Sequence, residues 1–289
     1  MLLRPDCRTA TALLVSALAL GACASSPVSV PEITSRATLN WQEATIGLPI
    51  DAFAMSPSQT NTVQAAQQIV FARCILGSGP IPDSTIRSAG ATLGTVVAPN
   101  RWVYGYWDMG FISAHGTGSP WGSYSVGQGL TFSDEQLKAC VYSEEYMSLD
   151  IIDGHTVTAS VSEGHDAGGL LMDISMSAYG QTLDDSRFKE LAQTRADCVT
   201  ARGYAIDPDS SYQGVGIQDG WGVEQTLKAA LVEAQCGDGM DFTQQAADIN
   251  ATYQQALIDR HEAELVAIQR LVEDRVARAT AILQDVGVM

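Results

Sequence analysis

The apolar positions of this chain recur mostly at the three- and four-residue spacing of amphipathic helices. The longest such segment is 241–285, which contains neither glycine nor proline. Its spacing predicts one continuous helix of about 65 Å. We expect the first part of this helix to pack on the rest of the protein. Beyond Glu262 two arrangements are compatible with the spacing: the helix also packs on the protein, or it projects or associates with a second copy as a coiled coil.

Four shorter helices are predicted before this segment. The first ends at Gly77, the second opens with a capping box between Ser133 and Gln136, and the third is followed by Gly203. A short helical turn is expected after Asp108. The predicted ranges are 62–76, 133–147, 185–202 and 223–235. The pattern therefore predicts a mainly α fold.

Two stretches lack helical periodicity. Residues 78–132 are rich in glycine and aromatic residues, and we expect them to form an irregular cover over the helices. Residues 151–177 contain several glycines and a weak apolar alternation, which suggests a small hairpin. The expected fold is thus a helical domain with a Gly/aromatic-rich irregular segment and a long C-terminal helix.

The N-terminus has the pattern of a bacterial lipoprotein signal. Arg4 and Arg8 precede an uncharged run that is too short to span a membrane but fits the apolar region of a signal peptide. The run ends in a lipobox, Leu-Gly-Ala-Cys at 20–23. We expect cleavage between Ala22 and Cys23, with diacylglycerol and palmitate on Cys23.

Composition restricts the partners. The chain of 289 residues is 46% hydrophobic and has a net charge of −17, so we expect a packed core and an acidic surface. Such a surface repels nucleic acid and anionic lipid headgroups. Attachment to the cell membrane, on its extracytoplasmic face, is therefore expected to depend on the N-terminal lipid alone.

Four cysteines remain after Cys7 is removed with the signal and Cys23 is lipidated. In an oxidising compartment an even number favours disulfides, and four cysteines allow three pairings. Sequential pairing is favoured because neighbouring helices usually pack together. The expected bonds are Cys74–Cys140 and Cys198–Cys236. A zinc site is the alternative, but no CxxC spacing supports it.

These elements predict four regions of the chain. They are a signal peptide (1–22), a lipidated cysteine with a flexible spacer (23–60), a helical extracytoplasmic domain (61–240), and the C-terminal helix (241–289).

Few residues suggest a chemistry. No nucleophile elbow, P-loop or intact metal motif is present, so we predict no metal or cofactor, and the sequence identifies no catalytic residue. An aromatic cluster is the one candidate ligand surface, for a sugar or peptide of the cell wall. The interpretation that we favour over this one is that its rings cap the helical core. The candidates are Trp102, Tyr106, Trp107 and Trp121.

Several short motifs resemble a group of uncharacterised secreted lipoproteins of high-GC Gram-positive bacteria. They are the segments 48–51, 72–74, 101–108, 198–199, 203–204 and 234–236, with Tyr253 in the final helix. In that group a methionine often follows the first and third cysteines, where this chain has Ile75 and Val199. The resemblance implies a lipid anchor, a cysteine framework and a helical fold, and it implies no activity.

Two functions are compatible with the sequence. The first is a non-enzymatic envelope lipoprotein that binds or scaffolds, with an exporter or the wall-assembly machinery as candidate partners and self-association through the final helix. The alternative is an envelope hydrolase whose carboxylates come together only in the fold. Two buried acids with shifted pKa values in one pocket would favour the hydrolase.

Overall fold

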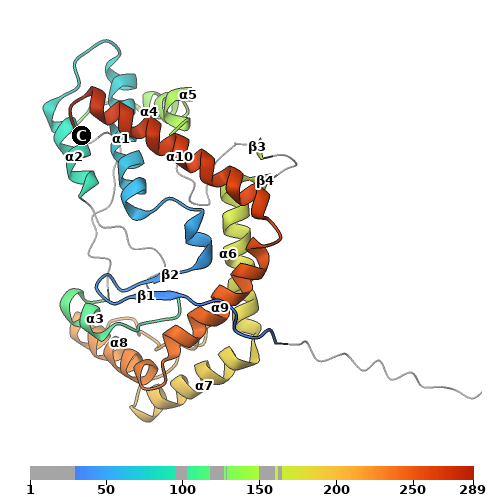
Figure 1. Cartoon of the computed structure of the whole chain (residues 1–289). Helices are drawn as coiled ribbons and strands as arrows, with labels where there is room; N and C mark the ends of the chain where they lie inside the picture. The colour runs from blue at the N-terminus through green and yellow to red at the C-terminus, as the bar shows by residue number, and fades with distance from the viewer. Residues whose placement is uncertain (1–29, 95–102, 118–126, 128, 150–159, 162–164) are drawn as a thin grey trace, which may run out of the picture. The chain divides into compact units, whose positions relative to one another are not determined.

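Helices dominate the computed structural model, which describes residues 30–94, 103–117, 127, 129–149, 160–161 and 165–289 (Figure 1). The helices are α1 (Pro57–Leu76), α2 (Asp83–Leu93), α3 (Met109–His115), α4 (Asp134–Val141), α5 (Glu144–Met147), α6 (Ala167–Asp184), α7 (Ser186–Ala201), α8 (Val223–Asp238), α9 (Phe242–Ile258) and α10 (Glu262–Asp285). No helix within these ranges is long and apolar enough to cross a membrane. The predicted mainly α fold is confirmed.

Residues 38–52 are folded, which corrects the prediction of a flexible spacer as far as residue 60. Strands β1 (Thr38–Asn40) and β2 (Thr45–Gly47) pair antiparallel, and the short 3-10 helix η1 (Pro49–Ala52) follows them. Ile46 and Ile50 are buried in the core, and the Ile50 amide donates to Gln254 of α9 at 3.1 Å. The Ser/Pro/Thr content concealed this apolar alternation, so the spacer is shorter than expected.

Side-chain caps define the starts of five helices, which are α1, α3, α4, α5 and α7. Ser56 and Gln59 form a capping box at α1, which begins five residues before the predicted start because Pro57 suits the first helical position. The predicted box of Ser133 and Gln136 opens α4, and Asp108 caps α3 as expected. Helices α7 and α8 also occur at their predicted positions.

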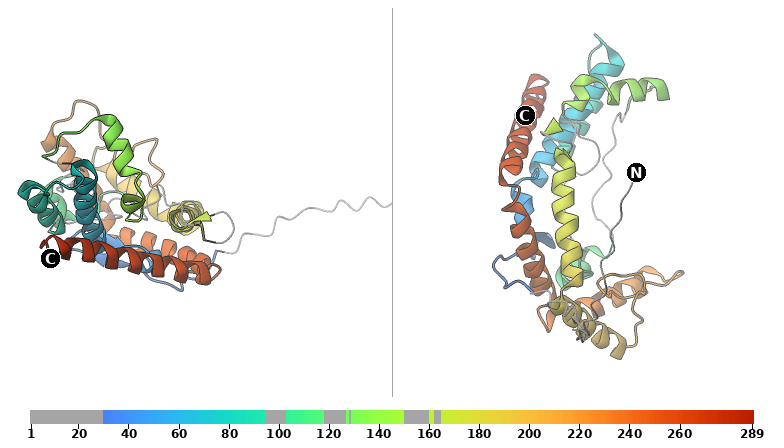
Figure 2. Two further views of the ribbon diagram at one scale, coloured as in Figure 1. Left: turned by 90° about the horizontal axis from the view of Figure 1, so that it is seen from above. Right: turned by 90° about the vertical axis from the view of Figure 1, so that its right-hand side faces the viewer.

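Two helices were not predicted. Helix α2 lies in the segment expected to be irregular, and α6 follows the strands β3 (Ser160–Val161) and β4 (His165–Asp166). These strands pair antiparallel, so a small hairpin is present where it was expected. Glycines near the start of α6 hid its helical spacing. Its apolar residues Leu171, Ile174 and Ala178 are buried, and it packs against α9 (Figure 2).

The C-terminal segment is two helices, which corrects the prediction of one continuous helix. The chain leaves the helical path at 259–261, where Asp259 and Arg260 are exposed. Helix α9 packs against α6, α7, α8 and η1, whereas α10 packs against α1. The segment contains no glycine or proline that would break a helix, so the different packing partners of α9 and α10 account for the break.

The distal helix α10 lies alongside α1 instead of projecting (Figure 1). Its residues Leu265 and Ile268 belong to a core formed with the β1–β2 hairpin, α6, α7 and α9. Ala279 and Leu283 belong to a second core formed with α1, α2 and Cys140. The apolar face that a coiled coil would have used is therefore covered within the chain.

Both predicted disulfides are present. The Cys74–Cys140 bond joins α1 to α4, and the Cys198–Cys236 bond joins α7 to α8. Each bond connects helices that also pack together, as the sequential pairing assumed.

Candidate functional site

A cavity of about 520 Å³ lies between α7, α9 and the segment through which the described chain begins. Its volume is in the range of about 300–1,000 Å³ that is typical of small-molecule sites. The lining combines aliphatic, polar and charged side chains. They are Ile33, Arg36, Arg187, Glu190, Leu191, Thr194, Gln245, Asp248 and Ile249.

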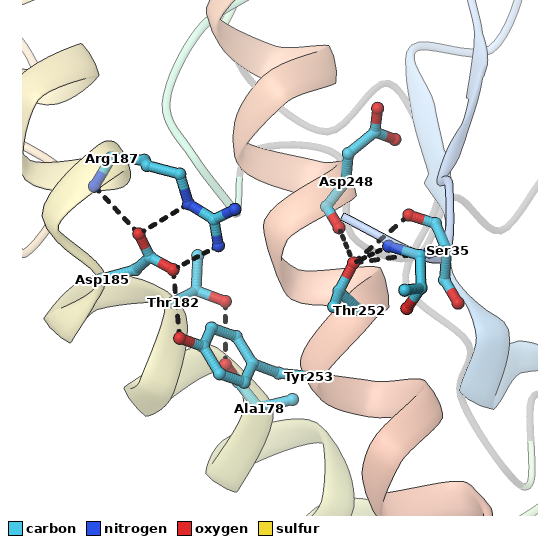
Figure 3. A network of polar contacts seen from close by, with 9 residues as sticks. Ser35, Ala178, Thr182, Asp185, Arg187, Asp248, Thr252 and Tyr253 are labelled. Carbon is cyan, nitrogen blue, oxygen red and sulfur yellow. Dashed lines mark hydrogen bonds and ion pairs between the residues drawn. The ribbon is translucent and has the colours of Figure 1, made fainter. Parts of the chain in front are cut away.

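Asp185 fixes the α7 side of the cavity. As the N-cap of α7 it accepts hydrogen bonds from the Arg187 amide at 2.9 Å and from Arg187 Nε and Nη2 at 3.0 and 2.6 Å (Figure 3). The Tyr253 hydroxyl of α9 donates to the same carboxylate at 3.0 Å. This network holds Arg187 in one orientation and ties α7 to α9.

The pKa shifts of Asp185 and Arg187 agree with this network. Burial raises the pKa of the Asp185 carboxyl, but the hydrogen bonds from Arg187 and Tyr253 outweigh it and bring that pKa below the usual range. The same carboxylate raises the pKa of the Arg187 guanidinium through its hydrogen bonds. The pair therefore stays ionised at neutral pH.

The opposite wall is the entering chain itself. The Ala37 amide donates to Asp248 Oδ1 at 2.9 Å, and Gln244 Nε2 donates to the Ala37 carbonyl at 3.1 Å. The Thr252 hydroxyl accepts from the amides of Thr34 and Ser35 at 3.3 and 3.4 Å (Figure 3). These contacts hold residues 34–37 against α9, with Ile33 and Arg36 beside the cavity.

A second polar cluster is structural. Arg195 and Glu233 are almost completely buried, and their Nη1 and Oε1 atoms are 3.4 Å apart. Arg195 donates to the carbonyls of Tyr104 and Tyr212 at 2.7 and 2.6 Å, and its guanidinium lies 3.7 Å from the ring centroid of Phe242. This cluster fastens two loops to α7, α8 and α9, and it does not line the cavity.

The described residues include only part of the candidate aromatic surface. Trp102 and Trp121 lie outside the described residues, as do Ala22 and Cys23. Tyr106 is half-buried, and Trp107 is buried in the core, so Trp107 cannot present its ring to a ligand.

The indole that is exposed belongs to Trp41, at the turn of the β1–β2 hairpin. It makes an edge contact with Trp107, with the ring centroids 5.0 Å apart. Asn40 Oδ1 accepts from the Gln42 amide at 3.0 Å, which fixes this turn. Trp41 was not among the predicted site residues, because the Ser/Pro/Thr content around it is typical of a spacer.

Metal ligands do not come together in the part of the chain that the structure describes, where no group of three His, Cys, Asp or Glu side chains is suited to an ion. His115 is exposed on α3 and its ring contacts Phe111, whereas His155 lies outside the described residues.

The cavity residues were not among the sequence-based candidates. Asp185 carried a local signal, since an aspartate directly before a helix is a typical N-cap. Arg36, Glu190 and Asp248 carried none, because they meet only when α7, α9 and the entering chain pack together.

Comparison with known proteins adds no relative. No protein-family model matches this chain, and no similar curated protein or solved structure was found.

Proposed function

We propose that this protein is a lipid-anchored, non-enzymatic binding protein of the extracytoplasmic face of the cell membrane, and that its ligand occupies the cavity between α7 and α9. One observation carries the proposal. One wall of the cavity includes Ile33 and Arg36, which follow the lipobox cysteine by ten and thirteen residues.

The short separation limits how far the cavity lies from the membrane. Ten extended residues span at most about 33–36 Å, and a flexible linker of this length has a root-mean-square span of about 16–19 Å. With Cys23 lipidated, the mouth of the cavity stays near the lipid surface. The cavity is then accessible to molecules of the cell envelope that lie close to the membrane.

A binding role accords better with the acidic groups than hydrolysis does. Burial raises the pKa of the carboxyls of Asp51 and Glu233. Neither lines the cavity, and Glu233 is held by Arg195 and by the Val215 amide at 2.9 Å. A hydrolase with a carboxylate pair remains the alternative function, and it would require acids other than these two.

The anchor is tested by mass spectrometry of the mature N-terminus. We expect a peptide that begins at Cys23 and carries diacylglycerol and palmitate, and we expect Cys23→Ala to release the protein from the membrane fraction. An unmodified N-terminus at another residue would contradict the anchor.

The binding role is tested by photo-crosslinking in intact cells. Benzoylphenylalanine in place of Thr194 puts a reactive group at the cavity, and the same residue in place of Glu273 serves as the matched control on the exposed face of α10. We expect a discrete adduct from position 194 only. The absence of an adduct, or equal labelling at both positions, would contradict a ligand in this cavity.

A further inference from the structure

The cavity carries both signs of charge in a protein that is otherwise strongly acidic. The chain has 16 basic and 33 acidic residues, yet the cavity lining contains two of each kind. The arginines are Arg36 and Arg187, and the acids are Glu190 and Asp248. The formal charge of these four lining side chains is therefore zero, and Asp185, which pairs with Arg187 from outside the lining, adds one negative charge behind it. Neither a simple anion nor a simple cation is favoured, because each would meet both signs.

These charges do not neutralise one another. Within the described ranges Arg36, Glu190 and Asp248 make no ion pair, so their charged groups lie more than 4.0 Å from any partner of opposite charge. Arg187 uses Nε and Nη2 for Asp185, and in the same ranges its Nη1 donates no hydrogen bond. The fold thus places the two arginines and the two acids around the cavity without pairing them with one another.

Asp248 is the best positioned of the acids. Its side chain is buried, with 8% of the residue exposed, and Oδ1 accepts from Ala37 and from Gln244 Nε2 at 2.9 and 2.8 Å. No described residue donates to Oδ2. A rigid carboxylate with one oxygen available at a cavity is a strong acceptor for an ammonium group.

An aliphatic surface lies between the charges. Leu191 of α7 and Ile249 of α9 line the cavity, and the exposed side chain of Ile33 lies at the entering chain. A ligand that fits this lining carries a carboxylate, an ammonium group and an aliphatic portion.

We propose that the cavity binds a zwitterionic ligand of the amino-acid or short-peptide type. Its carboxylate is bound by Arg36 and Nη1 of Arg187, its ammonium group by Glu190 and Oδ2 of Asp248, and its aliphatic part by Leu191 and Ile249. This inference rests on the proposed function, since it names the ligand class of the same site.

The test is isothermal titration calorimetry on residues 24–289, which omit the lipidated Cys23, with both disulfides formed. The probes are a panel of single amino acids and free dipeptides, and the N-acetylated and C-amidated forms of the panel member that binds best. We expect at least one free member to bind. Each blocked form should bind about tenfold more weakly or worse, because each lacks one charged hydrogen-bonding group.

Two charge variants test which residue binds each charged end of the ligand. Arg36→Gln should weaken binding of the free peptide and leave binding of the C-amidated form unchanged. Glu190→Gln should weaken the free peptide and leave the N-acetylated form unchanged. Both residues are exposed, so folding is preserved. Arg278→Gln and Glu273→Gln, on the exposed face of α10, are matched controls that should change neither affinity.

The outcomes separate this inference from the function on which it rests. If no panel member binds, or if blocked and free forms bind equally, the proposal of a zwitterionic ligand is wrong. When an adduct still forms at position 194 in cells, the cavity has a ligand of another class and the binding function survives. If the adduct is missing as well, both proposals fail.

Discussion

Removal of the Glu233 charge should destabilise the protein far more than removal of an exposed charge on the same helix. In Glu233→Gln the amide oxygen can still accept from the Val215 amide, which now donates to Glu233 Oε2 at 2.9 Å. What is lost is the negative charge whose Oε1 lies 3.4 Å from Arg195 Nη1. Arg195 then remains buried without a counter-charge.

The magnitude follows from the burial of both partners. Both side chains have only 1% of their surface exposed, and breaking a buried pair by removing one partner costs about 3–5 kcal/mol. We expect the lower end, about 3 kcal/mol, because Arg195 keeps its bonds to the Tyr104 and Tyr212 carbonyls. A loss of this size is a large fraction of the stability of a typical domain, about 5–15 kcal/mol.

Urea unfolding at pH 7 with the disulfides intact measures this effect. The matched control is Glu224→Gln, an exposed acid of α8 that pairs with Lys228 and should leave the midpoint unchanged. The double variant Arg195→Met with Glu233→Leu should remain destabilised, because two backbone carbonyls lose their donors. Full stability in Glu233→Gln, or recovery in the double variant, would refute this reasoning.

Three further predictions concern the network at α7, the second disulfide and the packing of α10. Asp185 has a lowered pKa, so its stabilisation is complete above its unfolded value of 3.8 and is lost as the pH falls through the lower folded value. In urea titrations, Asp185→Asn should therefore be less stable than wild type at pH 7, with a difference that shrinks below pH 4; a constant difference would contradict it. Replacing Cys198 and Cys236 by alanine opens a loop with a sequence separation of 38 and should cost about 4 kcal/mol in thermal unfolding. Leu283→Ala should cost about 2–5 kcal/mol and Gln284→Ala nothing measurable, because only Leu283 is buried; equal effects would mean that the end of α10 is free.

Local signals accounted for most of the fold. A few neighbouring residues were enough to predict the caps at Ser133 and Asp108 and the apolar stripe of α7. The order of the helices along the chain was enough to predict the cysteine pairing. Helix α6 was missed because glycines at its start resemble a loop, although burial against α9 keeps it helical.

Tertiary contacts decided what the sequence could not indicate. Ile258 and Leu265 are seven residues apart, a spacing that a continuous helix also gives, so only the different partners of α9 and α10 reveal the break at 259–261. In the same way, Ile46 and Ile50 look like isolated apolar residues in a linker until α9 covers them.

The cavity could not be predicted for the same reason. Its charged residues come from three segments that are distant along the chain, and none stands in a motif. Their significance depends on being near one another without pairing, which is a property of the folded protein alone.

Photo-crosslinking at position 194, compared between the anchored chain and its Cys23→Ala variant in intact cells, shows whether a short lipid tether holds the cavity close to its ligand at the membrane. We expect a discrete adduct in the anchored chain that is strongly reduced in the Cys23→Ala variant. An equal adduct in both, or none in the anchored chain, would contradict it.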